Sequence, residues 1–109
     1  MVHKMKLVDF AFNAIKNKVK TIEVRLNDEK RQLIKVGDII EFTHVDSLET
    51  IKVKVINIYK FKTFKELFEK FSNKQIGLLE NEDYTIMDKF YTKEEQEKYG
   101  AIGIEISLL

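Results

Sequence analysis

Strict alternation of apolar with polar or small residues at both ends of the chain is the feature that most limits its fold. Residues 102–108 read Ile-Gly-Ile-Glu-Ile-Ser-Leu, and residues 20–26 read Lys-Thr-Ile-Glu-Val-Arg-Leu. A period of two is typical of a β-strand with one buried face. Both segments are therefore predicted to be strands. In the strand over residues 20–26, Thr21, Glu23 and Arg25 share the face opposite the apolar side chains.

Turn residues and apolar patterns divide the rest of the chain into further strands and short helices. The expected elements are strands over residues 39–43 and 49–61 and helices or helical turns over residues 8–17, 27–33, 63–71 and 92–99. Two of the helices follow capping-box sequences that begin at Thr63 and Thr92. In the longer strand the apolar side changes near Val55, as happens where a strand bulges around a barrel.

These elements predict an α+β fold, a small mixed β-barrel with two or three short helices packed around it. A two-layer α+β sandwich would use the same elements, and periodicity does not separate the two. The 109 residues include no proline and no repeat, so we expect a single domain over residues 1–109.

Residue usage excludes several kinds of site. There is no cysteine, which rules out disulfides, thiolate nucleophiles and cysteine zinc sites. His3 and His44 are the only histidines, His44 is expected on the surface near a turn, and no acidic loop is present. We therefore expect neither a metal nor another cofactor. Without a signal-peptide pattern or a membrane-spanning apolar run, a cytoplasmic protein that does not contact membranes is expected.

Charge is unevenly distributed, although the net charge is only +1. Residues 1–25 carry six basic side chains against two acidic ones, and residues 60–74 carry five lysines against two glutamates. Residues 80–105 carry eight acidic side chains against three lysines. Basic segments can face a phosphate backbone, although solvated lysine-rich surface is the simpler interpretation. The acidic segment could instead meet a protein partner.

Residues 20–25 resemble the characteristic strand of the ASCH family, which carries the pattern Gly-x-Lys-x-x-Glu-x-Arg. Lys20, Glu23 and Arg25 occupy the three charged positions, and Lys18 stands at the position of the glycine. The resemblance continues in order through residues 27–31, 37–42 and 91–105. It therefore spans nearly the whole chain, in the order found in small stand-alone bacterial members.

The resemblance implies a PUA-like β-barrel whose cleft beside the motif strand binds RNA or a nucleoside or nucleotide ligand. The sequence leaves the oligomeric state open, and a monomer is the favoured expectation. The ligand-binding candidates are Lys18, Lys20, Glu23, Arg25, Asn27 and Tyr91. Arg25 could hold a phosphate or carbonyl oxygen through its planar fork, while Glu23 orients it or accepts a donor. The simpler alternative is an ion pair between Glu23 and Arg25 on the barrel surface.

Some family members resemble amidohydrolases that remove the acetyl group of N4-acetylcytidine with a Lys, a Thr and a Glu. Lys20 matches the lysine, but Glu23 stands where the threonine would fall, and residues 71–74 lack the glutamate. An enzyme would therefore use Lys20 as base, Thr21 as nucleophile, and Glu23 or a nearby acid as proton shuttle. The sequence leaves open whether the site binds a ligand or turns it over.

Overall fold

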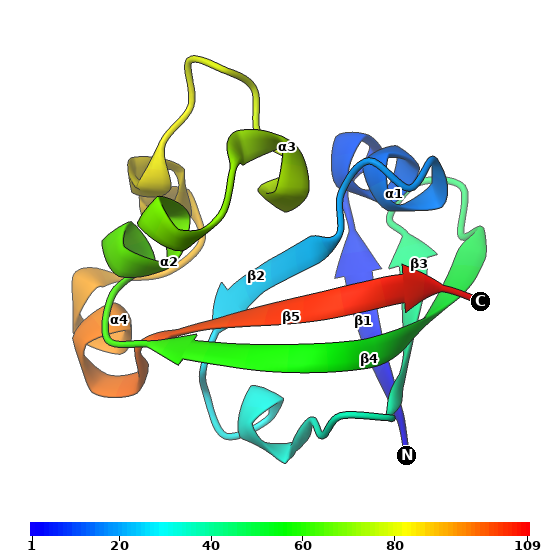
Figure 1. The fold of residues 1–109 in the computed structure, drawn as a ribbon, viewed down its shortest axis with the longest axis horizontal. Helices are drawn as coiled ribbons and strands as arrows, with labels where there is room; N and C mark the ends of the chain where they lie inside the picture. The colour runs from blue at the N-terminus through cyan, green and yellow to red at the C-terminus, as the bar shows by residue number, and fades with distance from the viewer.

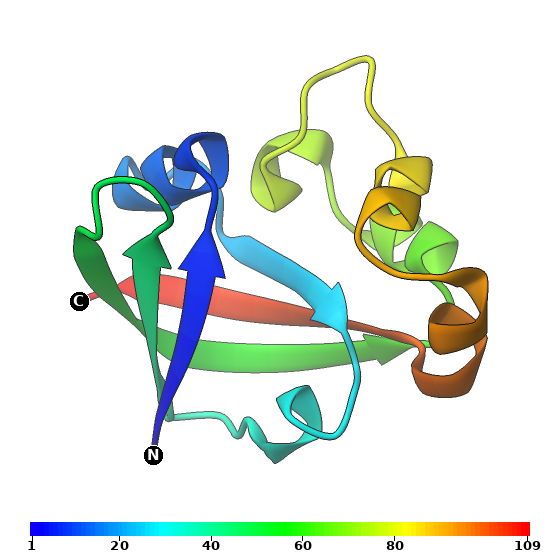
Figure 2. The same cartoon turned by 180° about the vertical axis from the view of Figure 1, so that it is seen from behind.

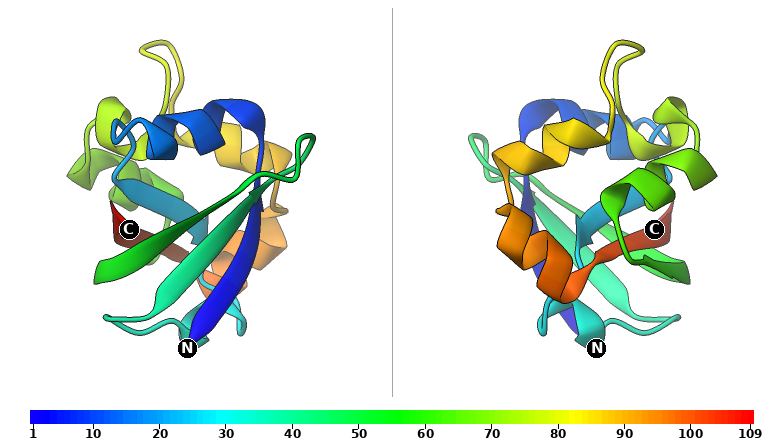
Figure 3. Two further views of the ribbon diagram at one scale, coloured as in Figure 1. Left: turned by 90° about the vertical axis from the view of Figure 1, so that its right-hand side faces the viewer. Right: turned by 90° about the vertical axis from the view of Figure 1, so that its left-hand side faces the viewer.

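A computed structural model describes residues 1–109, and its five strands form one strongly curled mixed sheet (Figure 1). The strands are β1 (Val2–Leu7), β2 (Ile22–Leu26), β3 (Ile39–His44), β4 (Thr50–Phe61) and β5 (Ala101–Leu108). Their order across the sheet is β1-β3-β4-β5-β2, with β1 and β3 parallel and all other neighbours antiparallel. The expected α+β fold is confirmed, and the sheet is a half-barrel rather than one layer of a flat sandwich (Figure 3).

Four short helices flank this sheet. They are α1 (Asp9–Lys16), α2 (Phe64–Lys70), α3 (Asn73–Ile76) and α4 (Lys93–Tyr99), with 3-10 turns at Arg31–Leu33 and Tyr84–Lys89. Helices α2 and α4 lie together at one end of the β4–β5 pair, whereas α1 lies at the other end of the molecule (Figure 2). None of the helices has the length and hydropathy that crossing a bilayer requires.

The predicted helix starts and the predicted bulge are present. Thr92 forms the complete capping box with Glu95, whereas the Thr63 side chain accepts from the backbone of Glu66 without the reciprocal bond. The pairing of β4 with β5 shifts register between Val55 and Asn57, where the apolar pattern changes side. Neither β1 nor α3 was among the elements expected from the sequence.

Two hydrophobic clusters lie on opposite faces of the β5–β2 half of the sheet. The cluster between the sheet and α1 consists of Met5, Leu7, Phe12, Ile15, Ile34, Ile40, Phe42, Val53, Val55, Ile102, Ile104 and Ile106. The cluster beneath α2 and α3 consists of Ile22, Val24, Leu26, Phe64, Leu67, Ile76, Met87 and Ala101. Because alternate residues of a strand point to opposite faces, Glu23 and Arg25 lie on the side of the first cluster, opposite Ile104 and Ile102.

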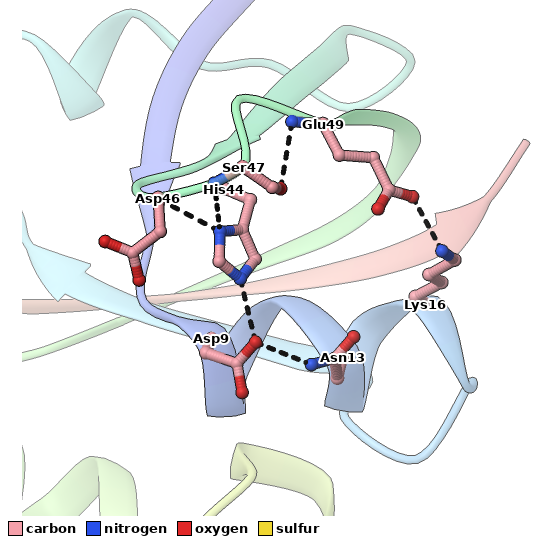
Figure 4. A network of polar contacts seen from close by, with 7 residues as sticks. All are labelled: Asp9, Asn13, Lys16, His44, Asp46, Ser47 and Glu49. Atoms are coloured by element: carbon pink, nitrogen blue, oxygen red, sulfur yellow. Dashed lines mark hydrogen bonds and ion pairs between the residues drawn. The ribbon is translucent and has the colours of Figure 1, made fainter.

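The turn after β3 is held by a buried histidine, which corrects the expectation that His44 lies on the surface. Its exposed fraction is 8%. The backbone N–H groups of Asp46 and Ser47 each donate to His44 Nδ1 at 3.1 Å, and His44 Nε2 lies 2.8 Å from Asp9 Oδ1 (Figure 4). Since Nδ1 accepts, Nε2 carries the proton and donates it to the Asp9 carboxylate.

A second histidine–aspartate pair joins the opposite ends of the same two strands. His3 Nε2 lies 2.8 Å from Asp38 Oδ2, and Asp38 also accepts from the backbone N–H of Lys35 and lies 3.5 Å from the N-terminal ammonium. The hydrogen bonds from His3 and Lys35 lower the pKa of Asp38 to about 2. The parallel β1–β3 pair is thus fastened at both ends by side chains.

Candidate functional site

The two edge strands of the half-barrel face each other across an opening that Arg25 spans. Strand β1 and strand β2 stand at opposite ends of the strand order. Arg25 on β2 nevertheless donates from Nη2 to the backbone carbonyl of Lys6 on β1 at 2.9 Å. A side chain therefore bridges the two edges where a closed barrel would have a backbone ladder.

Three charged side chains meet beside this bridge. Glu23 Oε1 lies 3.2 Å from Lys20 Nζ, and Glu23 Oε2 accepts from Arg25 Nε at 2.8 Å. The exposed fractions of the three side chains are 8% for Lys20, 4% for Glu23 and 16% for Arg25. The strand expected to be half-buried is therefore buried on both faces, because its polar face lies under the segments that surround it.

Glu23 is a carboxylate at neutral pH despite its burial. Burial alone would raise the pKa of Glu23, but the charges of Lys20 and Arg25 lower it below its ordinary value. Burial likewise opposes the charge of Arg25, while the Glu23 carboxylate raises the pKa of that guanidinium. The group contains one anion between two cations, and each charge depends on its neighbours.

Helix α3 and the glycine after it cover Lys20. Lys20 Nζ donates to the backbone carbonyl of Ile76, and the backbone N–H of Thr21 donates to Gln75 O at 2.9 Å. Gly77 has a φ of +84° and packs on the Lys20 side chain so closely that an added Cβ would lie 2.8 Å from Lys20 Cδ. Glycine is therefore required here both for its conformation and for its size.

A pocket of about 600 Å³ opens above the three charges. Its polar floor is formed by Lys20, Glu23 and Arg25. Its rim includes four apolar side chains that are at least half exposed, namely Val8, Phe10, Leu79 and Phe90. A buried charged floor below an apolar rim is the usual composition of a small-molecule site.

The pocket contains four of the six ligand-binding candidates. Lys20, Glu23, Arg25 and Tyr91 all line it. The Tyr91 ring stacks on Phe64 with a centroid separation of 5.9 Å and an interplanar angle of 6°. Because one face of the ring is occupied by Phe64, Tyr91 can offer a ligand its hydroxyl group, its edge or its other face.

Lys18 and Asn27 lie outside this pocket. Lys18 is exposed in the turn between α1 and β2, has a φ of +62°, and borders a separate hollow of about 180 Å³. Asn27 follows β2, where its backbone N–H donates to Gly100 O at 3.0 Å and its carbonyl accepts from the Gln32 side chain. Both residues belong to the turns that enter and leave the motif strand.

Thr21 makes no side-chain hydrogen bond to the charged group. It borders the smaller hollow, which Lys18 and Lys20 also line, and it is absent from the lining of the larger pocket. Its backbone carbonyl accepts from the N–H of Ile106 at 2.9 Å. The structure thus brings together the proposed base and acid, but not the proposed nucleophile.

Sequence reasoning missed Phe10, Leu79 and Glu82 as parts of the pocket. The exposure of Phe10 could have been predicted from the sequence, because this residue falls outside the helix face on which Phe12 and Ile15 are buried. Leu79 and Glu82 lie on the loop after α3, and no local pattern relates that loop to the motif strand. Metal ligands are not gathered here, since no three acidic or histidine side chains come together anywhere.

Comparison with known proteins gives consistent matches. The model of a protein family described as ASCH domain matches residues 5–109. The crystal structure of a hypothetical protein, PH0355, is 36% identical, with 100% of both chains covered and a TM-score of 0.85. The solution structure of the Pyrococcus furiosus protein PF0455 is 34% identical, with 100% of this chain and 98% of that chain covered and a TM-score of 0.76.

A more distant structure shares the fold alone. The mutant ZmASCH protein from Zymomonas mobilis is 15% identical, with 97% of this chain and 67% of that chain covered and a TM-score of 0.62. No curated protein matches. The matches do not support the expectation of a specifically bacterial type, because Pyrococcus furiosus is an archaeon.

Proposed function

Because this chain belongs to the ASCH domain family, we propose that it binds RNA or a nucleotide in the pocket above Lys20, Glu23 and Arg25. The family is associated with RNA binding. The surface that contacts the ligand is then this pocket, and the three charged motif residues form its floor.

The observation that carries the proposal is a group of three buried charges at the floor of an open pocket. Removing charges from water costs several kcal/mol per ion, and well-packed apolar side chains often serve stability as well or better. The interior of a small domain gains little from such a group unless the charges meet a ligand. Perturbed pKa values together with a concave site are typical of binding and catalytic centres.

Each part of the pocket suits one part of a nucleotide. The apolar rim, with Phe10 and Phe90 exposed by 54% and 63%, can cover the face of a base. The Glu23 carboxylate can accept from a base edge. A phosphate is better placed at the rim near Lys6 than at the floor, because Glu23 would repel it there.

The test is a titration of labelled single-stranded RNA by fluorescence anisotropy at low and high salt. We expect salt-sensitive binding, and the Glu23→Gln variant should weaken it by about tenfold, since one good base contact contributes about 1–3 kcal/mol. Glu41→Gln is the matched control, because Glu41 lies on β3 outside the pocket and should leave the affinity unchanged. Flat titrations with RNA, single-stranded DNA and nucleotides at low salt would refute the proposal.

An amidohydrolase acting on N4-acetylcytidine is the second candidate, because Lys20 Nζ and Glu23 Oε1 are 3.2 Å apart in the pocket. Since Thr21 does not line this pocket and its hydroxyl makes no hydrogen bond to Lys20 or Glu23, a water molecule is the better nucleophile in this arrangement. Cytidine release, followed by chromatography, would have to be lost in Lys20→Ala and retained in Thr21→Ala. An absence of cytidine removes this candidate for that substrate.

A further inference from the structure

We propose that the pocket floor recognises an imide edge, C(=O)–NH–C(=O), and thus selects a uracil-type base over the other bases. The inference rests on the proposed nucleotide-binding function and names the base that the site would take. It follows from the hydrogen-bonding capacity that the three charged side chains still have after their contacts with one another.

Glu23 supplies the central acceptor. Its two oxygens each accept one contact, from Lys20 on one side and from Arg25 on the other. A carboxylate oxygen has two lone pairs, so both oxygens can accept again. The two neighbouring cations lower the pKa of Glu23 against the effect of burial, which keeps the group an acceptor without a proton to donate.

Lys20 and Arg25 supply donors on either side of that acceptor. The Lys20 ammonium has three N–H groups. One donates to Ile76 O, the ammonium forms an ion pair with Glu23 at 3.2 Å, and a further N–H group is left for a ligand. Two of the five guanidinium N–H groups of Arg25 donate to Glu23 and to Lys6 O. The Tyr91 side chain is a further polar neighbour of this guanidinium, and N–H groups still remain for a ligand. Both cations line the pocket.

The order of these groups is set by which oxygen of Glu23 each cation contacts. Lys20 approaches Oε1 and Arg25 approaches Oε2, so the floor reads donor, acceptor, donor. The backbone carbonyls of Ile76 and Lys6 hold the two cations from behind. The pattern is therefore fixed before a ligand arrives, which lowers the entropy cost of binding.

The complementary ligand edge is acceptor, donor, acceptor. Uracil has this edge in O4, N3–H and O2, whereas cytosine presents an amino donor followed by two acceptors. Guanine places an amino donor at the third position, and adenine has no N–H at the centre. Cytosine and adenine therefore each oppose two like groups, and guanine opposes one. A buried polar group without a partner reduces affinity strongly.

The test compares monophosphates of equal phosphate content by isothermal titration calorimetry with the wild-type protein. The ligands are uridine, 3-methyluridine, cytidine and guanosine monophosphates, with flavin mononucleotide as a second carrier of an imide edge. We expect uridine monophosphate to bind about 10- to 100-fold more tightly than the 3-methyluridine and cytidine compounds. The N3-methyl group is the sharpest control, because it removes only the central donor.

The outcomes separate this inference from the proposed function. If RNA binds but these monophosphates show equal affinity, the imide assignment is wrong and the nucleotide-binding proposal stands. If neither RNA nor any nucleotide binds, the proposed function itself fails. Tighter binding of flavin mononucleotide than of uridine monophosphate would overturn the assignment to a base. Glu23→Gln, which puts an amide donor into the central position, should abolish the preference for uridine.

Discussion

A single carboxylate, Glu23, determines the properties of the pocket floor. It forms ion pairs with both Lys20 and Arg25 while it is itself almost fully buried. Loss of one member of such a group leaves the others buried without compensation, which costs more than the group contributes as a whole. A single substitution should therefore destabilise the protein more than the combined replacement of all three charged residues.

Glu23→Ala should lower the free energy of unfolding by about 3 kcal/mol or more, because two cations lose their partner in a buried position. Glu41→Ala on the outer face of β3 should change it by less than about 1 kcal/mol. Urea unfolding followed by circular dichroism measures both.

The combined variant Lys20→Met, Glu23→Leu, Arg25→Met should recover most of the stability and bind no RNA. Equal losses for Glu23→Ala and Glu41→Ala would show that the charged group is not coupled.

Asp38 should make the fold sensitive to acid. Its pKa of about 2 in the folded protein lies below the ordinary value of 3.8, so the unfolded chain takes up the proton first as the pH falls. Stability contributed by Asp38 is thus complete above about pH 4 and is lost between about pH 4 and pH 2. Asp38→Asn should flatten the dependence of the unfolding free energy on pH in this window, whereas Asp46→Asn, at an exposed turn, should not. An unchanged slope in Asp38→Asn would contradict the assignment.

Helix α3 and Gly77 together form the roof that covers Lys20 at the pocket floor. The segment is only four residues long, yet it supplies the carbonyl for Lys20, the backbone partner of Thr21 and the buried Ile76 side chain. Gly77 ends the helix and makes the close approach to Lys20 possible. A substitution at this glycine should therefore disturb the contact with Lys20, whereas a substitution at a glycine in another turn should not.

Gly77→Ala should both destabilise the protein and weaken RNA binding, since the new Cβ meets Lys20 Cδ at 2.8 Å. Gly37→Ala is the matched control, because Gly37 also has a positive φ but has no atom within 4 Å of an added Cβ. Both variants should lose about 1 kcal/mol from backbone strain. Only Gly77→Ala should show the additional loss and the weaker anisotropy signal. Equal affinities in the two variants would show that the roof does not position Lys20.

The elements differ in how far the sequence predicts them, for physical reasons. The α4 capping box and the bulge near Val55 were predictable because they depend on neighbouring residues. Strand β1 was missed because its buried set includes His3 and its partner strand begins 37 residues later in the register. The faces of Glu23 and Arg25 were predictable from strand period, but the contact of Lys20 with Ile76 joins residues 56 positions apart and has no local pattern.

One sheet joins the two hydrophobic clusters of the molecule. Strand β5 contributes Ile102, Ile104 and Ile106 to one cluster and Ala101 to the other. Two of the three floor residues, Glu23 and Arg25, lie on β2, and every residue of β2 pairs with β5. We therefore propose that residues 1–109 are one cooperative domain, in which neither cluster survives without the other.

Phe42→Ala in the first cluster and Leu67→Ala in the second should each lower the stability of the whole chain, by about 2–5 kcal/mol. Amide signals from both clusters should disappear at the same urea concentration in each variant when unfolding is followed by NMR. Two separate transitions, with only the mutated cluster shifted, would show two units instead of one.

An NMR titration of the isotope-labelled protein with a short single-stranded RNA that contains uridines locates the binding site most directly. Amide shifts should concentrate in residues 20–25, in residues 76–91 and at the β1–α1 junction, which together surround the pocket. The exposed lysines Lys52 and Lys54 on β4 should change little. Shifts confined to those lysines, with the signals of Glu23 and Arg25 unmoved at saturation, would show that the charged pocket is not the binding site.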